Sequence, residues 1–258
     1  HWSGGLYWKS MHPDFEASSG YVNRVDYRTL GAYTSFRLFP EKQYLNQVSL
    51  HINGGRRYSY FGDTLVDSWL ESNLQFRITE FTQVIANFQN YMERYEGIDF
   101  RGNVYTLGGE LYLIKWLPFG FAFETGDRIF YDPDDPFLGW SNTYILYLTV
   151  KPSKRIQAGL DFSKQTFWEE RGGELVYDFN VIRQKTTYQL SKTLSLRAII
   201  DYNHYDKEIY GSFLVSWILR PGTVFFAGVD NNFFKDEFGK YERTGYSVFI
   251  KFSYWWRV

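Results

Sequence analysis

Tyr246-Ser-Val-Phe-Ile-Lys-Phe-Ser-Tyr-Trp-Trp-Arg-Val258 is the stretch of this 258-residue sequence that decides the fold. Every second residue of it is apolar or aromatic, and most of the residues between them are polar. Alternation with a period of two gives a β-strand one polar and one apolar face. A strand that closes a membrane barrel has this pattern, with aromatic residues where lipid meets water. The stretch therefore predicts a membrane-facing strand.

The composition of the whole chain agrees with this prediction. Aromatic residues make up 21% of the sequence, yet the mean hydropathy is −0.38. A helical membrane protein needs spans of about 20 mostly apolar residues, and the sequence contains no such run. A membrane β-barrel needs only alternate apolar residues, because its lumen is polar. The composition favours this all-β class over a large soluble sandwich, propeller or lectin-like sheet.

Cysteine content, charge and motifs exclude several classes of function. The chain has no cysteine, which excludes disulfides, thiolate metal sites and a cysteine nucleophile. The net charge is −1, so we expect no nucleic-acid partner. A glycine-rich phosphate loop and a nucleotide fingerprint are both missing, and we expect no cofactor. The sequence starts at His1 without a signal peptide, which suggests either a processed mature protein or part of a longer one.

Turn residues divide the chain into about fourteen alternating segments, which predicts one transmembrane, antiparallel up-and-down β-barrel domain over residues 1–258. Two kinds of connection are expected to alternate strictly. Short turns are predicted at residues 40–43, 79–81, 117–120, 152–154, 191–193 and 220–222. Longer polar connections are predicted at residues 11–28, 53–67, 95–103, 127–141, 165–174, 203–208 and 230–244. This asymmetry is typical of Gram-negative outer-membrane barrels, and an even strand number places both termini in the periplasm.

Charged side chains on the polar faces of these segments are expected to line the lumen. A charge that faces hydrocarbon costs roughly 2–4 kcal/mol at the midplane of the bilayer. Both signs of charge are present, so we expect no strong ion selectivity. The segment 174–190 changes phase near Val181 and Ile182 and yields no lumen assignment. The candidate lumen-lining residues are Arg37, Glu71, Arg77, Glu110, Asp161, Arg197, Asp201 and Lys251.

Several motifs resemble a known family. Pro13-Asp-Phe15 and Gly20-Tyr-Val-Asn-Arg-Val-Asp-Tyr27 resemble a late hairpin in a family of bacterial outer-membrane β-barrel domains of unknown function. The Pro221-Gly-Thr223 turn and the terminal strand resemble the end of the same barrels. Family members usually carry a family-9-like carbohydrate-binding module ahead of the barrel. The resemblance implies either the C-terminal part of such a barrel or a smaller relative, and it supplies no catalytic residues.

The terminal strand also resembles an insertion signal. Its alternating residues Phe252, Tyr254 and Trp256 resemble the C-terminal signal that the barrel-assembly machinery reads. Such signals usually end in Phe, and Val258 departs from that pattern. The expected partners are therefore the lipid bilayer and, during insertion, the assembly machinery.

Candidate catalytic groups are few. The segment Asp201-Tyr-Asn-His-Tyr-Asp206 surrounds His204 with carboxylates, as a general base requires, but a solvated loop is the favoured interpretation. A barrel phospholipase needs a Ser/His pair on the lipid-facing surface. His51 is predicted on a polar face, and no serine is recognisably paired with it. Asp132-Pro-Asp-Asp-Pro136 lacks the spacing of a calcium loop. We expect no enzyme and no metal site.

Four aromatic residues are expected in or beside extracellular loops: Trp140, Phe167, Trp168 and Tyr205. Aromatic faces stack on sugars or pack against protein partners, but the outer interfacial girdle also needs Tyr and Trp. The girdle is the favoured interpretation of these four residues, with a saccharide or protein ligand as the alternative.

The sequence leaves two hypotheses for function. The first is a porin-like channel or carrier for small polar solutes, with saccharides suggested by analogy with the family. The second is a structural membrane anchor for a surface or periplasmic assembly, or for a carbohydrate-binding module. Fold alone does not decide between them.

Overall fold

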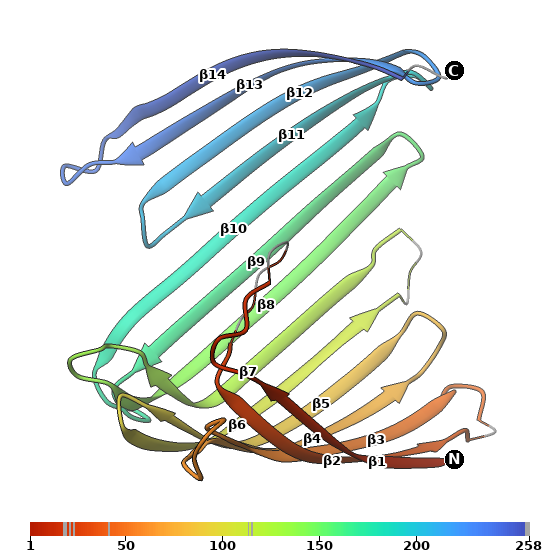
Figure 1. Cartoon of the computed structure of the whole chain (residues 1–258). Coiled ribbons are helices and arrows are strands. Elements are labelled where there is room, and N and C mark those ends of the chain that lie inside the picture. The colour runs from red at the N-terminus through yellow and green to blue at the C-terminus, as the bar shows by residue number, and fades with distance from the viewer. Residues whose placement is uncertain are drawn as a thin grey trace. The chain divides into compact units, whose positions relative to one another are not determined.

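The computed structural model describes residues 1–17, 20, 22, 24–40, 42–112, 114 and 116–255. These residues form one 14-stranded antiparallel sheet in which the strands follow one another in chain order (Figure 1). Within the same ranges, no helix has the length and apolar character that crossing a membrane requires. The prediction of an all-β, up-and-down arrangement of about fourteen strands is confirmed.

The strands have the following bounds: β1 Trp2–Met11, β2 Tyr27–Leu38, β3 Gln47–Tyr58, β4 Leu65–Arg77, β5 Gln83–Tyr95, β6 Ile98–Leu111, β7 Phe119–Phe130, β8 Phe137–Ser153, β9 Ile156–Trp168, β10 Leu175–Gln189, β11 Leu194–Asn203, β12 Glu208–Arg220, β13 Thr223–Lys235 and β14 Tyr241–Tyr254.

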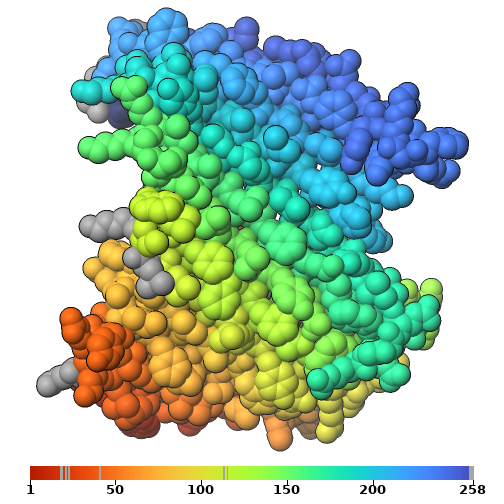
Figure 2. Space-filling view, turned by 180° about the vertical axis from the view of Figure 1, so that it is seen from behind, coloured from red at the N-terminus to blue at the C-terminus, as the bar shows by residue number. Residues whose placement is uncertain are grey.

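The chain divides into two compact units. Unit 1 comprises His1–Glu110, Ala122–Asn142 and Thr166–Tyr177, and unit 2 comprises Leu111–Phe121, Thr143–Gln165 and Asp178–Val258. Strands β6, β7, β8, β9 and β10 contribute residues to both units. In Figure 2 the colours form successive bands, so that strands adjacent in the sequence are also adjacent within each unit.

The predicted strict alternation of short and long connections is wrong. Glu96 and Gly97 alone connect β5 to β6, where a long loop was expected. These two residues have φ angles of 46° and 79°, which a two-residue hairpin turn with both central residues left-handed requires. Conversely, a short turn was expected between β2 and β3, but β2 ends at Leu38, β3 begins at Gln47, and Lys42 forms a bridge with Leu45 between them.

Cross-strand register sorts the side chains of each unit onto one apolar and one polar face. The apolar face of unit 1 includes Leu6, Ala32, Leu50, Ile52, Leu70, Leu74, Ala86 and Leu107. The apolar face of unit 2 includes Leu196, Ala198, Ile200, Phe213, Val215, Ala227, Val229, Val248 and Ile250. The polar face of unit 1 includes Ser35, Arg37, Ser49, His51, Arg57, Asp67, Glu71, Gln75, Asn87 and Glu93. The polar face of unit 2 includes Arg183, Lys185, Thr187, Ser195, Arg197, Asp201, Tyr210, Asp230 and Lys251.

The apolar faces are not covered by protein. Leu6 is 83% exposed and Ile250 is 72% exposed, although both belong to strands paired in the sheet. Isolated exposed apolar residues are normal, but contiguous rows of them require an apolar partner. The apolar side of each unit is therefore a continuous surface for an apolar partner, either lipid or protein.

Aromatic rings on the polar faces pack over glycines of the neighbouring strand. A Cβ added at Gly55 would lie 2.6 Å from the ring of Trp69, its cross-strand partner. Rings over glycine fix both side-chain orientation and strand register. The same cross-strand arrangement occurs in five pairs: Gly5 with Tyr33, Gly31 with Tyr7, Gly55 with Trp69, Gly102 with Tyr91 and Gly228 with Phe249.

Candidate functional site

The register places four of the candidate lumen residues on the polar face of unit 1: Arg37, Glu71, Arg77 and Glu110. Glu71 accepts a 2.7 Å hydrogen bond from Asn87 Nδ2. Neighbouring polar side chains continue the network, since Ser49 Oγ donates to Gln75 Oε1 at 3.2 Å. The four residues thus belong to a hydrogen-bonded polar surface, and their role in lining a lumen stays a prediction.

In unit 2 the register places Arg197, Asp201 and Lys251 on the polar face. Asp201 accepts two hydrogen bonds from Arg183, at 2.7 Å from Nε and 2.6 Å from Nη2. Asp161 lies within electrostatic reach of the same arginine. Arg183 was missed because the phase change near Val181 obscured which residues of β10 face Asp201.

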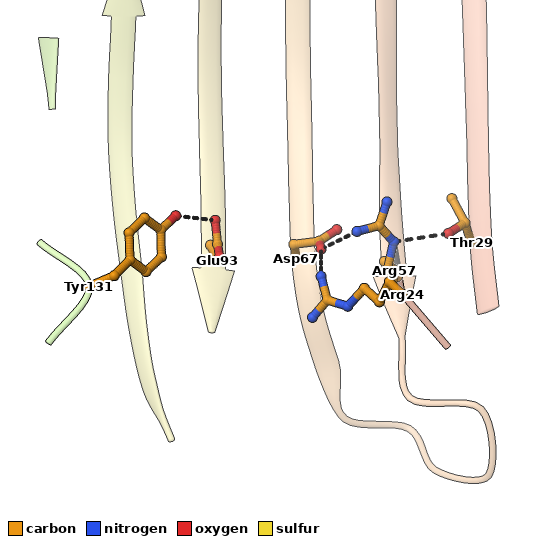
Figure 3. Close-up of polar contacts among 6 residues, drawn as sticks. All are labelled: Arg24, Thr29, Arg57, Asp67, Glu93 and Tyr131. Carbon is orange, nitrogen blue, oxygen red and sulfur yellow. Dashed lines mark hydrogen bonds and ion pairs between the residues drawn. The ribbon is translucent and has the colours of Figure 1, made fainter. Parts of the chain in front are cut away.

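A second group of charged residues on unit 1 lies in segments predicted to be loops. Arg57 Nη1 donates to Asp67 Oδ2 at 2.6 Å, and Arg24 Nη1 donates to the same oxygen at 3.1 Å (Figure 3). Arg57 Nε also donates to Thr29 Oγ1 at 3.3 Å. β3 extends to Tyr58 and β4 begins at Leu65, so Arg57 and Asp67 are cross-strand partners. One carboxylate therefore holds two guanidinium groups.

The other oxygen of this carboxylate is buried without a partner. Asp67 Oδ1 has no hydrogen-bond partner among the described residues, and the Asp67 side chain is only 15% exposed. Buried carboxylate oxygens normally accept hydrogen bonds. Because this oxygen is buried from solvent, its missing hydrogen bond is a cost of holding the carboxylate between two arginines.

Aromatic rings and charged groups enclose a cavity of about 290 Å³ beside this pair. Trp69, Tyr91 and Tyr131 supply its aromatic wall, with Arg57 and Arg128 among its charged lining. The Arg57 guanidinium lies 5.8 Å from the centre of the Trp69 ring, within range of a cation–π interaction. We call this cavity, with Arg57, Asp67, Trp69, Tyr91, Glu93, Arg128 and Tyr131, the charged aromatic site.

A tyrosine beyond the end of β7 completes this site. Tyr131 Oη donates to Glu93 Oε2 at 3.1 Å (Figure 3). The ring of Tyr131 contacts that of Tyr95 edge to face, with centroids 5.2 Å apart. Burial, followed by the nearby Glu93 carboxylate, raises the pKa of Tyr131 to about 12. The phenol therefore remains a hydrogen-bond donor throughout the physiological pH range.

A close approach between β6 and β7 positions the Tyr91 side of the site. Gly126 has a φ of 149°, and a Cβ there would lie 2.1 Å from the carbonyl oxygen of Asn103. The following residue, Asp127, accepts a hydrogen bond from Asn103 N through Oδ2 at 2.8 Å. Its carbonyl oxygen accepts the Tyr91 hydroxyl at 3.0 Å. Only glycine permits this backbone contact.

The expectation that no serine pairs with His51 is wrong. Ser35 and His51 are cross-strand partners, and Ser35 Oγ lies 2.6 Å from His51 Nδ1. Register across β2 and β3 creates this pair, which spacing along the sequence does not reveal. Both side chains lie on the polar face, so they do not meet the requirement for a lipid-facing phospholipase pair. Among the described residues, no carboxylate hydrogen-bonds to the His51 ring.

The two carboxylates that flank His204 in the sequence form hydrogen bonds with residues other than His204. Asp201 pairs with Arg183, and Asp206 Oδ2 accepts a 2.5 Å hydrogen bond from Asn203 Nδ2. His204 Nδ1 instead lies 3.3 Å from the Tyr202 hydroxyl. The described residues contain no group of His, Asp or Glu side chains arranged to hold a metal ion.

Three of the four expected loop aromatics, Trp140, Phe167 and Trp168, belong to strands. Trp140 lies within β8, where the Arg171 guanidinium sits 5.0 Å from its ring centre. Phe167, in β9, is 1% exposed and stacks on Tyr177 with centroids 5.2 Å apart. Its assignment to ligand or partner contact is wrong, because a buried ring cannot reach a ligand. Strand bounds that extend into predicted loops explain these corrections.

Trp168 and Tyr205 lie at or beyond a strand end. Trp168 is the last residue of β9, and Tyr205 lies between β11 and β12, where it is 62% exposed. Of the three residues of the expected insertion signal, Phe252 and Tyr254 lie in β14, with Phe252 paired to Phe225. Trp256 falls outside the described residues.

Comparisons with known proteins give a resemblance to solved structures. No family model and no curated protein matches the chain. Among solved structures, a chain described as "CymD monoaromatic hydrocarbon channel" is similar over 98% of this chain and 84% of its own length. The two sequences are 10% identical and the TM-score is 0.31.

Proposed function

We propose that the sheet closes into an outer-membrane β-barrel that acts as a channel or carrier for small polar solutes. The observation that carries this proposal is that each of the two units has one exposed apolar face and one hydrogen-bonded polar face. A transmembrane barrel requires that division, because lipid contacts one side of each strand and the lumen contacts the other. Monomeric soluble proteins rarely expose contiguous rows of aliphatic side chains such as those that include Leu6 and Ile250.

Strand length supports the same proposal. A tilted strand needs about 9–11 residues to cross the hydrocarbon layer. The shortest strands, β1 and β11, have 10 residues, and β8 has 17. All fourteen can therefore span a bilayer, with the longer ones projecting beyond it.

We propose saccharides as the solutes that the charged aromatic site accepts. Sugars present C–H faces that pack on aromatic rings and hydroxyl groups that pair with carboxylates and guanidinium groups. Trp69 and Tyr131 offer the rings, and Glu93 and Arg128 in the same lining offer charged partners for the hydroxyl groups. A cavity near 290 Å³ suits one or two sugar rings, given that small-molecule pockets begin at about 300 Å³.

Conductance in planar bilayers tests the channel and its saccharide site together. We expect stepwise currents that maltooligosaccharides block, and a Trp69→Leu variant that requires roughly tenfold more sugar for the same block, because stacking on the ring contributes about 1–2 kcal/mol. Trp8→Leu is the matched control, since Trp8 lies on the apolar face and is 66% exposed. A protein that inserts but passes no current would refute the channel, and equal block of both variants would refute the saccharide site.

The exposed aromatics in the connections favour a second function, a membrane scaffold for a surface assembly. Phe238, between β13 and β14, is 94% exposed, and Phe61, between β3 and β4, is 76% exposed. Large exposed rings on connections are typical of partner-binding surfaces. We expect native purification to return a stoichiometric partner if the barrel is a scaffold. Monodisperse barrels without a partner would contradict this function.

A further inference from the structure

Charges in unit 2 are segregated along the strands. At the strand ends next to the turns at residues 154–155, 190–193 and 221–222, the only charged residues are lysine and arginine. In the sequence, residues 111–121, 143–160, 179–200, 209–229 and 243–255 contain no aspartate or glutamate. Apart from Asp161 near the middle of β9, the acidic residues of unit 2 lie toward the opposite strand ends, where Asp201 pairs with Arg183 and Asp178 with Lys164. One end of the unit is therefore purely cationic.

A recess of about 540 Å³ lies at this cationic end. Its lining includes Trp116, Lys151, Lys154 and Arg155, all of which belong to unit 2. Two backbone hydrogen bonds build it: Lys151 N donates to Trp116 O at 2.8 Å, and Gln189 N donates to Arg155 O at 2.7 Å. The β6–β7 connection, the β8–β9 hairpin and the end of β10 thus form the recess together.

The cations of the recess have no internal counter-charge. Lys151, Lys154 and Arg155 are exposed, and within the described parts of the chain none of them forms an ion pair. Arg197 adds a fourth positive charge, because it is the cross-strand partner of Thr187, which also lines the recess. Several uncompensated cations in one concavity focus a positive potential. Such a site attracts a negatively charged ligand.

The chemistry of the lining specifies the ligand further. Lysine and arginine donate charge-assisted hydrogen bonds to carboxylate and phosphate oxygens. The side-chain amide of Gln157 adds a neutral donor, and the Trp116 ring offers an apolar wall. Thr187 and Gln189 pair with Arg197 and Ser195 on the polar face, which a soluble solute reaches and an acyl chain does not.

We propose that this recess is a binding site for a small organic anion, held through a carboxylate or phosphate group. The site rests on the proposed function in one respect, since a solute reaches it in the membrane only if the polar face lines a pore. The proposal therefore predicts that anionic solutes bind at the cationic end of unit 2. The occupant is a soluble anion, with a phospholipid headgroup as the competing source of the same chemistry.

Binding to the full chain in detergent tests the site directly. We expect calorimetry to show that glucose 6-phosphate and glucuronate bind and that neutral glucose does not. Lys154→Gln combined with Arg155→Gln should weaken both affinities at least about tenfold, because two charge-assisted contacts are lost. Lys207→Gln combined with Lys235→Gln removes the same charge from the opposite strand ends and should leave both affinities unchanged. Equal binding of glucose, or an equal loss in both double variants, would overturn the proposal.

Two further measurements separate the alternatives. The reversal potential under a KCl gradient reports anion preference, and it should shift toward zero in the recess variant. Currents without anion binding would overturn this site and leave the channel intact, whereas anion binding without current would overturn the channel and leave the site intact. In nanodiscs with phosphatidylglycerol, a recess variant that loses lipid binding but keeps sugar-phosphate binding would reassign the site to lipid headgroups.

Discussion

Gly55→Ala is expected to destabilise the folded protein by about 1–3 kcal/mol, the usual cost of overpacking a tight contact. The added Cβ would lie 2.6 Å from Trp69 Cζ2, 2.8 Å from Cη2 and 2.9 Å from the carbonyl oxygen of Leu30. The ring cannot relieve the contact alone, because the carbonyl oxygen lies in the backbone of the neighbouring strand. Either the β2–β3 ladder shifts or Trp69 leaves its position beside Arg57. The aromatic wall of the charged aromatic site would then be displaced.

Gly211→Ala is the matched control for this prediction. Gly211 lies within β12, and an added Cβ there would meet no atom within 4 Å. Both substitutions restrict the unfolded chain equally, and this restriction alone favours the folded state by about 0.4–1 kcal/mol. Urea unfolding in lipid vesicles measures both. If Gly55→Ala unfolds at the same urea concentration as Gly211→Ala, the ring of Trp69 does not rest on Gly55.

The strand number and the two faces could be predicted because a period of two is a local property of the sequence. The β14 residues Val248, Ile250 and Phe252 alternate with Ser247, Lys251 and Ser253, and register places the two sets on opposite faces. Each strand needs only its own residues to show this pattern. The prediction therefore did not depend on knowing which residues of adjacent strands are partners.

The strand ends could not be predicted in the same way. Gly-Gly-Arg-Arg-Tyr58, at the end of β3, has no apolar alternation, although it continues the strand. Beyond the apolar band both faces of a strand are polar, so composition there resembles a loop. Arg57 and Asp67 were consequently assigned to a connection, and the charged aromatic site went unrecognised. A signal was present, since Gly55 and Trp69 are a glycine–aromatic pair of the kind that recurs across the sheet.

Contacts between strands were also beyond prediction. The Ser35–His51 and Arg183–Asp201 pairs arise from register, which depends on turn length and on the packing of neighbouring strands. A prediction of register requires the ends of both strands, and those ends were the least well defined. Phe167 shows the same limit, because its burial depends on Tyr177 of the next strand.

Asp67→Ala is expected to have the second large effect, a loss of about 2–3 kcal/mol in unfolding free energy. Breaking a fully buried ion pair costs about 3–5 kcal/mol, and solvent screening reduces the value here because Arg24 is 41% and Arg57 29% exposed. The variant leaves two guanidinium groups side by side without the carboxylate that holds them. The destabilisation should shrink at high salt, since salt screens the repulsion between exposed charges.

A double variant separates the loss of a favourable pair from the exposure of an unpaired charge. In Arg57→Met combined with Asp67→Leu, apolar side chains replace both partners, and no charge of the pair is left uncompensated. We expect this double variant to be more stable than Asp67→Ala alone, although it carries one more substitution. The outcome to exclude is additivity, in which the double variant loses as much unfolding free energy as Arg57→Met and Asp67→Leu lose when measured separately and summed. Additivity would mean that Arg57 and Asp67 stabilise the sheet independently, and that the 2.6 Å contact between them contributes nothing of its own.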